Sequence, residues 1–399
     1  MDYPIVFIPG LFGSLGDDII PGTGRFSFGF ADYVYRPFIE ILNAMGYVEG
    51  KDLFISYYDW RKPVLESVNK YLLPDIEKVK MKTGADKVIL IAHSLGGLLG
   101  RAYISYFKPY CIDKLIMIGT PNLGSINSYY FWSGGELYYP KLKNNIIYNG
   151  IKAGFALYYR LFHDIDYIDA IRNLFPISKD VLPSYIYGNY LILEEDGIKK
   201  EIPIKDMSIN NPFLNLMETK HMDFNNIFTI AGSGIPTNEK FEINIKDMGE
   251  NKWIDGRPIK AYKTLDGDGT VTTISALGHF GTNNIILEGS HTGILHKSKD
   301  YLSFILEKHL IREVEEKKIE KVYIILAQDC EKINVKTSME NQISNKAISI
   351  MDNRVKALNL ETNNFWIMVV GDKDLDIHLD VDKIEGIEPR VYMSIMEEI

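Results

Sequence analysis

The sequence has few of the features that mark specialised protein classes. Its 399 residues include only 2 cysteines, Cys111 and Cys330. Two cysteines cannot build a disulfide framework, and their spacing matches no zinc motif. No apolar run reaches the length needed to cross a membrane, because the longest one, within residues 87–106, is interrupted by polar residues and glycines.

Acidic residues outnumber basic ones. The chain has 44 Lys and Arg against 53 Asp and Glu, for a formal net charge of -9. This balance argues against a nucleic-acid partner and against electrostatic adhesion to anionic lipid. A protein of this charge that works at a lipid surface must make the contact with apolar and aromatic side chains.

The remaining composition is ordinary for a globular protein. Hydrophobic residues make up 46% and charged residues 24%, and the length allows two domains or one domain with insertions. A strand-like run follows Met1 at once, so no secretory signal is visible. This leaves a cytoplasmic or membrane-peripheral protein, or a secreted chain in mature form, and the sequence does not decide the oligomeric state.

Residues 87–106, KVILIAHSLGGLLGRAYISY, organise the chain. They begin as a short β-branched strand and end with apolar residues at helical spacing. Between the two the chain must reverse direction sharply around Ser94, and the small residues Ala92 and Gly96 stand two positions either side of it. This pattern indicates the nucleophile elbow of α/β-hydrolases, with Ser94 exposed above the sheet, rather than an ordinary serine in a glycine loop.

The acid and the base of a catalytic triad are expected further along the chain. In α/β-hydrolases the order is Ser, then Asp or Glu, then His. Asp268 in the turn DGDGT follows a predicted strand and is the first choice for the acid, with Asp266 in reserve. His291, on the loop after the last core strand, is the candidate base. The DGDG stretch lacks the spacing of the other ligands of a calcium loop.

The oxyanion hole is predicted from two backbone amides. Ile5–Ile8 reads as a strand that ends in a glycine-flanked turn, and the amide of Leu11 in this turn can point into a cleft. The second donor is the amide of Leu95, directly after the serine. On local sequence alone an ordinary turn explains residues 9–14 equally well. None of the other histidines shows a ligand spacing, so no metal and no cofactor is expected.

The alternation of strands and helices is interrupted from residue 127 to about 225, where aromatic residues crowd together. A long insertion between two sheet strands is where a cap or lid belongs. Most of its aromatics are expected to pack the core of the cap, and some to line an acyl pocket or touch a lipid interface. These residues are Tyr129, Tyr130, Phe131, Trp132, Tyr138, Tyr139, Phe155, Tyr158, Tyr159, Phe162, Tyr185, Tyr187 and Tyr190.

The predicted fold class is therefore α/β, an α/β-hydrolase fold whose mostly parallel sheet is flanked by helices. Residues 1–126 and 226–312 are expected to form the core, and residues 127–225 the cap. A helix over about 298–318 should close the core. From 320 to 399 short strands between turn signals predict a small antiparallel β-sandwich without catalytic residues.

The chain resembles the lecithin:cholesterol acyltransferase (LCAT)-like family of α/β-hydrolase lipases and phospholipases over about residues 4–312. Each motif is weak alone, and their order is specific. The resemblance rests on Val6-Phe7-Ile8-Pro9-Gly10, Tyr58-Asp59-Trp60-Arg61, Ala92-His93-Ser94-Leu95-Gly96-Gly97, Gly119-Thr120-Pro121, Gly267-Asp268-Gly269-Thr270-Val271 and the loop of His291.

The resemblance implies a Ser–Asp–His triad, a capped acyl-binding cleft and a lipid or other acyl-ester substrate that is hydrolysed or whose acyl group is transferred. The chain lacks the disulfide-closed loops of the animal enzymes, so it does not imply lipoprotein recognition. Two alternatives stay open: an esterase acting on soluble esters, and a non-catalytic binding protein on a hydrolase scaffold. Acyl-chain length, head group and acceptor are not readable from the sequence.

Overall fold

The computed structural model describes residues 3–107, 109–136, 146–163, 168–220, 224–249, 251–280, 283–315, 319–361 and 363–397. Contacts divide the chain into two units, each assembled from three segments. The first unit comprises Met1–Leu11, Phe38–Pro140 and Ile165–Val314. The second comprises Phe12–Pro37, Lys141–Asp164 and Glu315–Ile399. The predicted domain limits at 126, 226 and 320 stay predictions.

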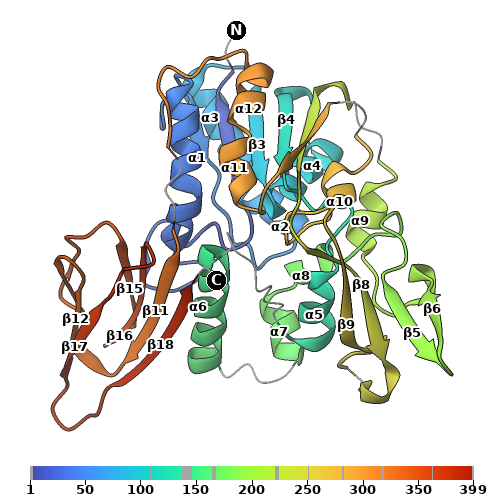
Figure 1. The fold of residues 1–399 in the computed structure, drawn as a ribbon. Coiled ribbons are helices and arrows are strands. Elements are labelled where there is room, and N and C mark those ends of the chain that lie inside the picture. Colours follow the sequence, from blue (N-terminus) through green and yellow to red (C-terminus); the bar gives the residue numbers. More distant parts are fainter. Residues whose placement is uncertain are drawn as a thin grey trace. The chain divides into compact units, whose positions relative to one another are not determined.

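A parallel sheet of six strands is the centre of the first unit (Figure 1). Its order is β10-β7-β4-β3-β1-β2, and every neighbouring pair is parallel. The central strands are buried along their whole length, as expected of strands covered on both faces. The strands are β1 (Ile5–Ile8), β2 (Leu53–Ile55), β3 (Val88–His93), β4 (Ile112–Ile118), β7 (Ile227–Ser233) and β10 (Asn284–Glu288).

Helices connect these strands. Helix α2 (Val64–Ser67) continues through a π-helical stretch, Val68–Leu72, into α3 (Leu73–Thr83), whose first turn contains Pro74. Helix α4 (Leu95–Tyr106) follows β3. The other helices are α1 (Asp32–Ala44), α5 (Asn127–Gly134), α7 (Ile168–Leu174), α8 (Ile177–Asp180), α9 (Pro212–Met217), α10 (Thr273–Leu277), α11 (Gly293–Lys297) and α12 (Lys299–Leu306).

A four-stranded sheet of order β6-β5-β8-β9 completes the first unit. It consists of β5 (Leu191–Glu195), β6 (Ile198–Ile202), β8 (Thr237–Asn244) and β9 (Arg257–Thr264). Strands β8 and β9 pair in antiparallel direction, and β8 ends at Asn244 while β9 begins at Arg257.

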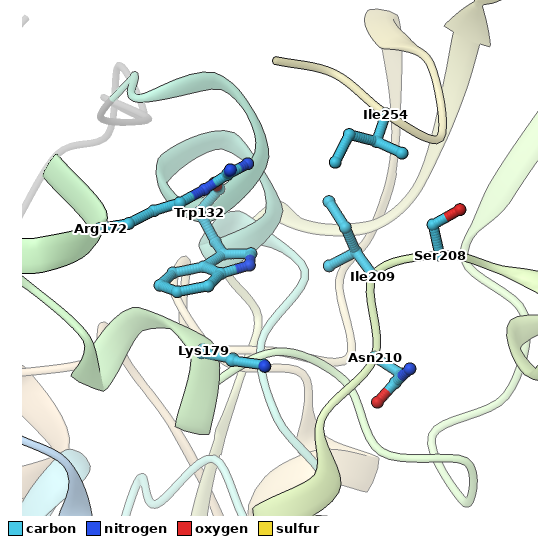
Figure 2. Close-up of a pocket in the computed structure, with 7 residues that line it drawn as sticks. All are labelled: Trp132, Arg172, Lys179, Ser208, Ile209, Asn210 and Ile254. Atoms are coloured by element: carbon cyan, nitrogen blue, oxygen red, sulfur yellow. The ribbon is translucent and has the colours of Figure 1, made fainter. Parts of the chain in front are cut away.

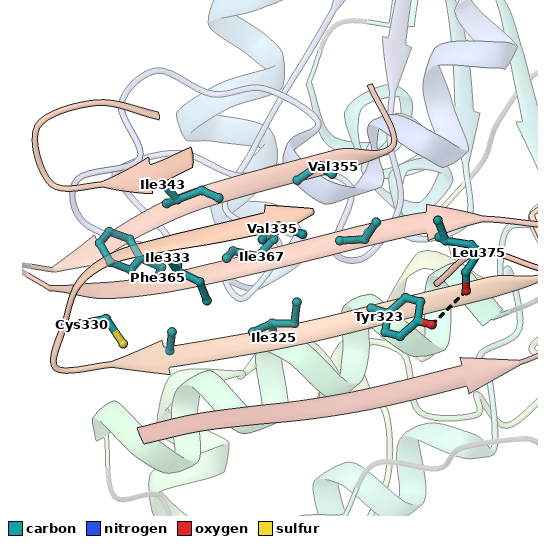
Figure 3. Packing of buried hydrophobic residues seen from close by; sticks show 12 residues of the cluster. Tyr323, Ile325, Cys330, Ile333, Val335, Ile343, Val355, Phe365, Ile367 and Leu375 are labelled. Atoms are coloured by element: carbon teal, nitrogen blue, oxygen red, sulfur yellow. Dashed lines mark hydrogen bonds between the residues drawn. The ribbon is translucent and has the colours of Figure 1, made fainter. Parts of the chain in front are cut away.

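The second unit contains a β-sandwich at its C-terminal end, as predicted. One antiparallel sheet has the order β15-β16-β11-β18 and the other β14-β13-β12-β17. Their facing side chains form one apolar core, in which the hydroxyl of Tyr323 donates a hydrogen bond of 3.0 Å to the carbonyl of Leu375 (Figure 3). The strands are β11 (Lys321–Gln328), β12 (Cys330–Lys336), β13 (Glu340–Ser344), β14 (Ile348–Ser349), β15 (Val355–Glu361), β16 (Asn364–Gly371), β17 (His378–Lys383) and β18 (Arg390–Glu397).

Helix α6 (Ile146–His163) also belongs to the second unit, where it contacts β11 and β18. Its buried ring of Phe155 packs edge-on against Trp366 and stacks on Phe12. Gly150 and Gly154 allow the close approach, because a Cβ at Gly154 would lie 2.1 Å from the Trp366 ring. The helix therefore completes the apolar packing on one side of the sandwich.

The predicted helix over 298–318 is shorter than expected. Within the described residues, α12 ends at Leu306, and Glu307 adopts a left-handed conformation with φ 53°. Arg312 and Glu313, further along the chain, are exposed. The sequence from Arg312 onward, REVEEKK, contains one apolar residue, so it lacks the apolar face that would hold a longer helix on the core.

Candidate active site

The serine turn joins β3 to α4 with a strained backbone. Ser94 has φ 53° and ψ −126°, and a positive φ is uncommon for a residue with a side chain. Its amide donates to the carbonyl of Ile118 on the neighbouring strand, at 2.8 Å. Ser94 was expected to be exposed, but only 7% of its surface is accessible. The turn is the strand–turn–helix geometry predicted from the sequence.

Small residues after Ser94 let α4 approach the first strand closely. A Cβ at Gly96 would lie 2.4 Å from the carbonyl oxygen of Ile8 and 2.5 Å from that of Pro9. A Cβ at Gly97 would overlap the Thr120 side chain. Position 96 therefore requires glycine, because the two atoms that a Cβ would meet are backbone oxygens, which cannot move aside as a flexible side chain can.

The structure brings together the three side chains that the sequence analysis selected. The Nε2 atom of His291 lies 2.8 Å from the Oγ atom of Ser94, and its Nδ1 atom lies 2.7 Å from Oδ2 of Asp268. His291 and Asp268 are 1% and 0% exposed. The imidazole therefore lies between a hydroxyl and a carboxylate, away from bulk water, which is the arrangement that activates a nucleophilic serine.

The carboxylate of Asp268 is held by its own turn. Its Oδ1 atom accepts hydrogen bonds from the amides of Thr270 and Val271, at 2.9 and 2.8 Å. This leaves Oδ2 for the imidazole of His291. Asp266, the reserve choice for the acid, is exposed and does not take this position.

His93 holds the backbone of His291, a role that the sequence analysis did not identify. Its Nε2 atom lies 2.9 Å from the carbonyl oxygen of His291, and since a carbonyl can only accept, Nε2 of His93 carries the proton. Burial, and then the nearby charge of His291, lower the pKa of His93 well below its usual value. His93 is therefore a neutral donor. Its place in the motif, directly before the serine, was visible in the sequence, but its hydrogen-bond partner was not.

The loop after β1 is anchored by the Tyr58-Asp59-Trp60-Arg61 segment. The Tyr58 hydroxyl donates to the carbonyl of Pro9, at 2.9 Å. The Arg61 guanidinium contacts both carboxylate oxygens of Asp59, at 2.8 and 2.7 Å. Such a bidentate pair fixes the orientation of the segment.

The amides of Leu11 and Leu95 follow these anchored elements. Leu11 comes two residues after Pro9, and Leu95 is the first residue of α4. The first amides of a helix have no partner within the helix, and the helix dipole makes this end attractive to negative charge. In the described part of the chain neither amide donates a hydrogen bond.

A buried arginine ties α4 to the loop after β4. Arg101 is 1% exposed and donates to the carbonyl of Asn122 at 2.8 Å and to the carboxylate of Glu218 at 2.6 Å. Its guanidinium also lies over the ring of Phe280. Burial lowers the pKa of Arg101, and Glu218 partly offsets that effect. The sequence offered no signal for this pair, since its members are far apart in the chain.

Most aromatics of residues 127–225 are buried in one of two cores. Tyr129 and Tyr190 pack with Trp253 in the first unit, and Phe155, Tyr158 and Tyr159 belong to the second. Tyr185 is 50% exposed. Tyr138, Tyr139 and the side chain of Phe162 lie outside what the structure describes. A lipid contact through these aromatics stays a prediction.

Comparison with known proteins shows a similarity to one family over part of the chain. The family model for lecithin:cholesterol acyltransferase matches residues 28–186, which include Ser94 but not Asp268 or His291. Phospholipase A(1) LCAT3 of Arabidopsis thaliana is 32% identical over 98 residues, 23% of this chain and 22% of that protein. A triacylglycerol lipase of Pseudarthrobacter phenanthrenivorans is 31% identical over 125 residues, 31% of this chain and 34% of that protein. Over residues 28–186 the chain is similar to the LCAT family.

The matches thus span between a fifth and about a third of these relatives' own lengths. Among solved structures, the propeptide form of lipase BlEst2 from Bacillus licheniformis is 12% identical, with 99% of this chain and 74% of that one covered and a TM-score of 0.37. The α/β-hydrolase fold of this chain rests on its own strand order and serine turn.

No helix in the described residues is both long enough and apolar enough to span a membrane. The same residues contain no group of three or more His, Cys, Asp or Glu side chains placed to hold a metal ion.

We predict that Gly96→Ala destabilises the protein, because its methyl group would meet the backbone oxygens of Ile8 and Pro9 at 2.4 and 2.5 Å. Overpacking of this kind costs about 1–3 kcal/mol. Urea denaturation measures the change. Gly249→Ala is the matched control, since its Cβ would meet Lys252 at 3.4 Å and φ there is ordinary. Equal stability of the two variants would contradict the prediction.

Proposed function

We propose that the protein is a serine hydrolase or acyltransferase that acts on lipid esters through a Ser94–His291–Asp268 triad. The single observation that carries this proposal is the pair of hydrogen bonds made by His291, 2.8 Å to Ser94 and 2.7 Å to Asp268. The serine hydroxyl contacts the imidazole, and the imidazole contacts the carboxylate. Together the three buried side chains supply a nucleophile, a base and an acid that orients the base.

In the proposed first step, Oγ of Ser94 attacks the ester carbonyl carbon and its proton moves to Nε2 of His291. Asp268 accepts the Nδ1 proton in a hydrogen bond and stabilises the imidazolium without taking the proton. The tetrahedral intermediate then breaks its bond to the leaving alcohol, which receives the proton from His291. An acyl-enzyme on Ser94 remains, and a second acceptor releases the acyl group by the reverse sequence.

The amides of Leu11 and Leu95 are the proposed oxyanion donors. Their support is the position of Leu95 at the start of α4 and the anchoring of Pro9 by Tyr58 two residues before Leu11. Losing one such donor typically costs about 3 kcal/mol of barrier stabilisation. The negative charge that develops on the carbonyl oxygen would meet two N–H groups with no competing acceptor in the described chain.

A lipid ester is the substrate class that the relatives favour. The matched proteins are a phospholipase A(1) and a triacylglycerol lipase, and the matched family model is that of lecithin:cholesterol acyltransferase. Water as the acceptor makes the protein a lipase or phospholipase, and a bound alcohol makes it an acyltransferase. We assign the role of cap over the acyl site to residues 127–225, because this insertion separates β4 from β7.

Labelling with a fluorophosphonate probe tests the triad. We expect the probe to modify Ser94 in the unaltered protein, and Ser94→Ala to abolish both labelling and the turnover of p-nitrophenyl esters. Ser105→Ala, on the far end of the same helix, serves as the matched control and should keep both. Turnover that survives Ser94→Ala would refute the proposed nucleophile, and absent labelling would favour a non-catalytic binding protein.

Substrate length and aggregation test the lipid assignment. We expect kcat/KM to rise with acyl-chain length from acetate to decanoate esters, because an apolar acyl site gains about 0.8 kcal/mol for each buried CH2. Activity should rise further once the ester forms aggregates. A preference for acetate, unchanged above the aggregation point, would indicate an esterase for soluble substrates instead. Product analysis with phosphatidylcholine, triglyceride and a sterol acceptor distinguishes hydrolysis from transfer.

We predict that His93 is a positioning residue for the base. His93→Phe keeps a ring but loses the donor to the His291 carbonyl, so kcat should fall about fivefold while KM changes little, because one hydrogen bond contributes about 1 kcal/mol. His93→Gln keeps an N–H donor and should recover part of kcat. The pH midpoint of kcat should be the same in the Gln variant, since His93 is neutral. Equal rates in the Phe and Gln variants would contradict the positioning role.

A further inference from the structure

A small pocket in the first unit is lined by none of the proposed catalytic residues. It has a volume of about 160 Å³, several times what a single water molecule needs. Its walls come from α5, α7, α8 and two loops, and the lining residues are Trp132, Arg172, Lys179, Ser208, Ile209, Asn210 and Ile254. All of them belong to the same unit.

One wall of this pocket carries hydrogen-bond donors. Figure 2 shows the nitrogen-bearing ends of Trp132, Arg172 and Lys179 on the same side, directed toward Ile209, Asn210 and Ile254. The two cations also flank the indole, with Arg172 5.3 Å and Lys179 5.8 Å from its ring centre. A neutral aromatic donor and two positive groups thus converge on one small volume.

The charge of Arg172 is only weakly compensated. Its Nε and Nη2 atoms donate to the carbonyls of Trp132 and Asn251, at 2.9 and 2.7 Å, and these acceptors carry no charge. The nearest carboxylate, Asp169, lies 3.9 Å from Nη1 and is 55% exposed. Burial lowers the pKa of Arg172, and Asp169 offsets this only in part. An anion in the pocket would stabilise the guanidinium.

Lys179 has no carboxylate partner within 4 Å in the described part of the chain. The acids beside the pocket are engaged elsewhere. Asp180 accepts from the amide of Val64, at 2.8 Å. Asp255 accepts from the amides of Ser208 and Ile209, at 2.7 and 2.8 Å. Among the described residues neither carboxylate forms an ion pair with the two cations, although the charge of Lys179 opposes the rise in the pKa of Asp180 that burial causes.

We propose that this pocket binds a phosphate group, either free or at the head of a lipid. The donors approach from three elements of the fold, which suits the three terminal oxygens of a phosphate ester better than the two coplanar oxygens of a carboxylate. Ile209 and Ile254 form an apolar wall opposite, where the carbon atoms attached to the phosphate can lie. The site is independent of the ester chemistry proposed for Ser94.

Calorimetric titration with inorganic phosphate tests the site in the unaltered protein. We expect binding, and at least a tenfold weaker Kd in Lys179→Gln and in Arg172→Gln, since each removes a charge-assisted hydrogen bond. Lys205→Gln, which removes an exposed charge outside the pocket, is the matched control and should bind as before. Trp132→Phe keeps the ring and loses the N–H, and should weaken binding less.

Lipid vesicles distinguish a phosphate at the head of a lipid from a free phosphate. Ser94→Ala protein, in which the proposed turnover is blocked, is mixed with phosphatidylcholine vesicles with and without phosphatidic acid. Binding that needs phosphatidic acid and is lost in Lys179→Gln identifies a lipid headgroup, whereas binding of inorganic phosphate alone identifies a free phosphate. Both outcomes support the site, and both can be obtained even if the protein is not an esterase.

Three results would overturn the proposal. The first is no binding of either probe. The second is binding that none of the pocket variants weakens. The third is octanoate binding as tightly as phosphate with the same sensitivity to Lys179→Gln, which would assign the pocket to carboxylates. If Arg172→Gln fails to fold, because it anchors two backbone carbonyls, the Lys179 and Trp132 variants decide the question.

Discussion

The close approach of helix α4 to the backbone of strand β1 is the constraint on which the site depends. Gly96 makes it possible, since any side chain there would meet the carbonyls of Ile8 and Pro9. The approach forces Ser94 into its left-handed conformation and brings the start of α4 beside the loop that carries Leu11. Because Gly96 has no side chain, Ser94 and the two amides that are proposed to bind the oxyanion can lie close together.

His291 is fixed from several sides, which gives the site its order before any substrate binds. Asp268 holds the imidazole through Nδ1, and its own carbonyl accepts the amide of His291, at 2.9 Å. His93 holds the carbonyl of His291. Beneath the ring, Gly119 has φ 60° and would place a Cβ 3.3 Å from the imidazole. Preorganisation of this kind lets hydrogen bonds act on developing charge without a cost in reorganisation.

The sequence was most informative where function and fold impose the same local pattern. The serine turn follows the buried strand β3, and the loop of His291 follows β10 of the same parallel sheet, so the carboxyl ends of these strands bring the two side chains to one edge of the sheet. The acid turn follows β9 of the other sheet, and a bridge from Asp268 to Ile235 ties it to the end of β7. The choice of Asp268 over Asp266 could be made from its turn. The neutral donor role of His93 could not, because it depends on a carbonyl 198 residues away in the chain.

Where the sequence was uninformative, the deciding contacts lie between distant segments. The ring of Phe155 packs against Trp366, a contact between segments about 210 residues apart that no local pattern reveals. The sequence predicted a β-sandwich over residues 320–399, but not which of its strands pair in each sheet. Trp132, Arg172 and Lys179 line one pocket from three separate helices, and their spacing in sequence carries no sign of it.

The discontinuous make-up of the second unit has a consequence for how the protein is synthesised. Residues 12–37 and the helix α6 leave the ribosome long before the strands that cover them, which begin at Lys321. Before Trp366 is synthesised, Phe12 and Phe155 can stack on each other, but Phe155 cannot pack against Trp366. Folding of this unit must therefore wait for the strands that begin at Lys321, and contacts of such long sequence separation are slow to form. These strands complete the assembly of segments synthesised much earlier.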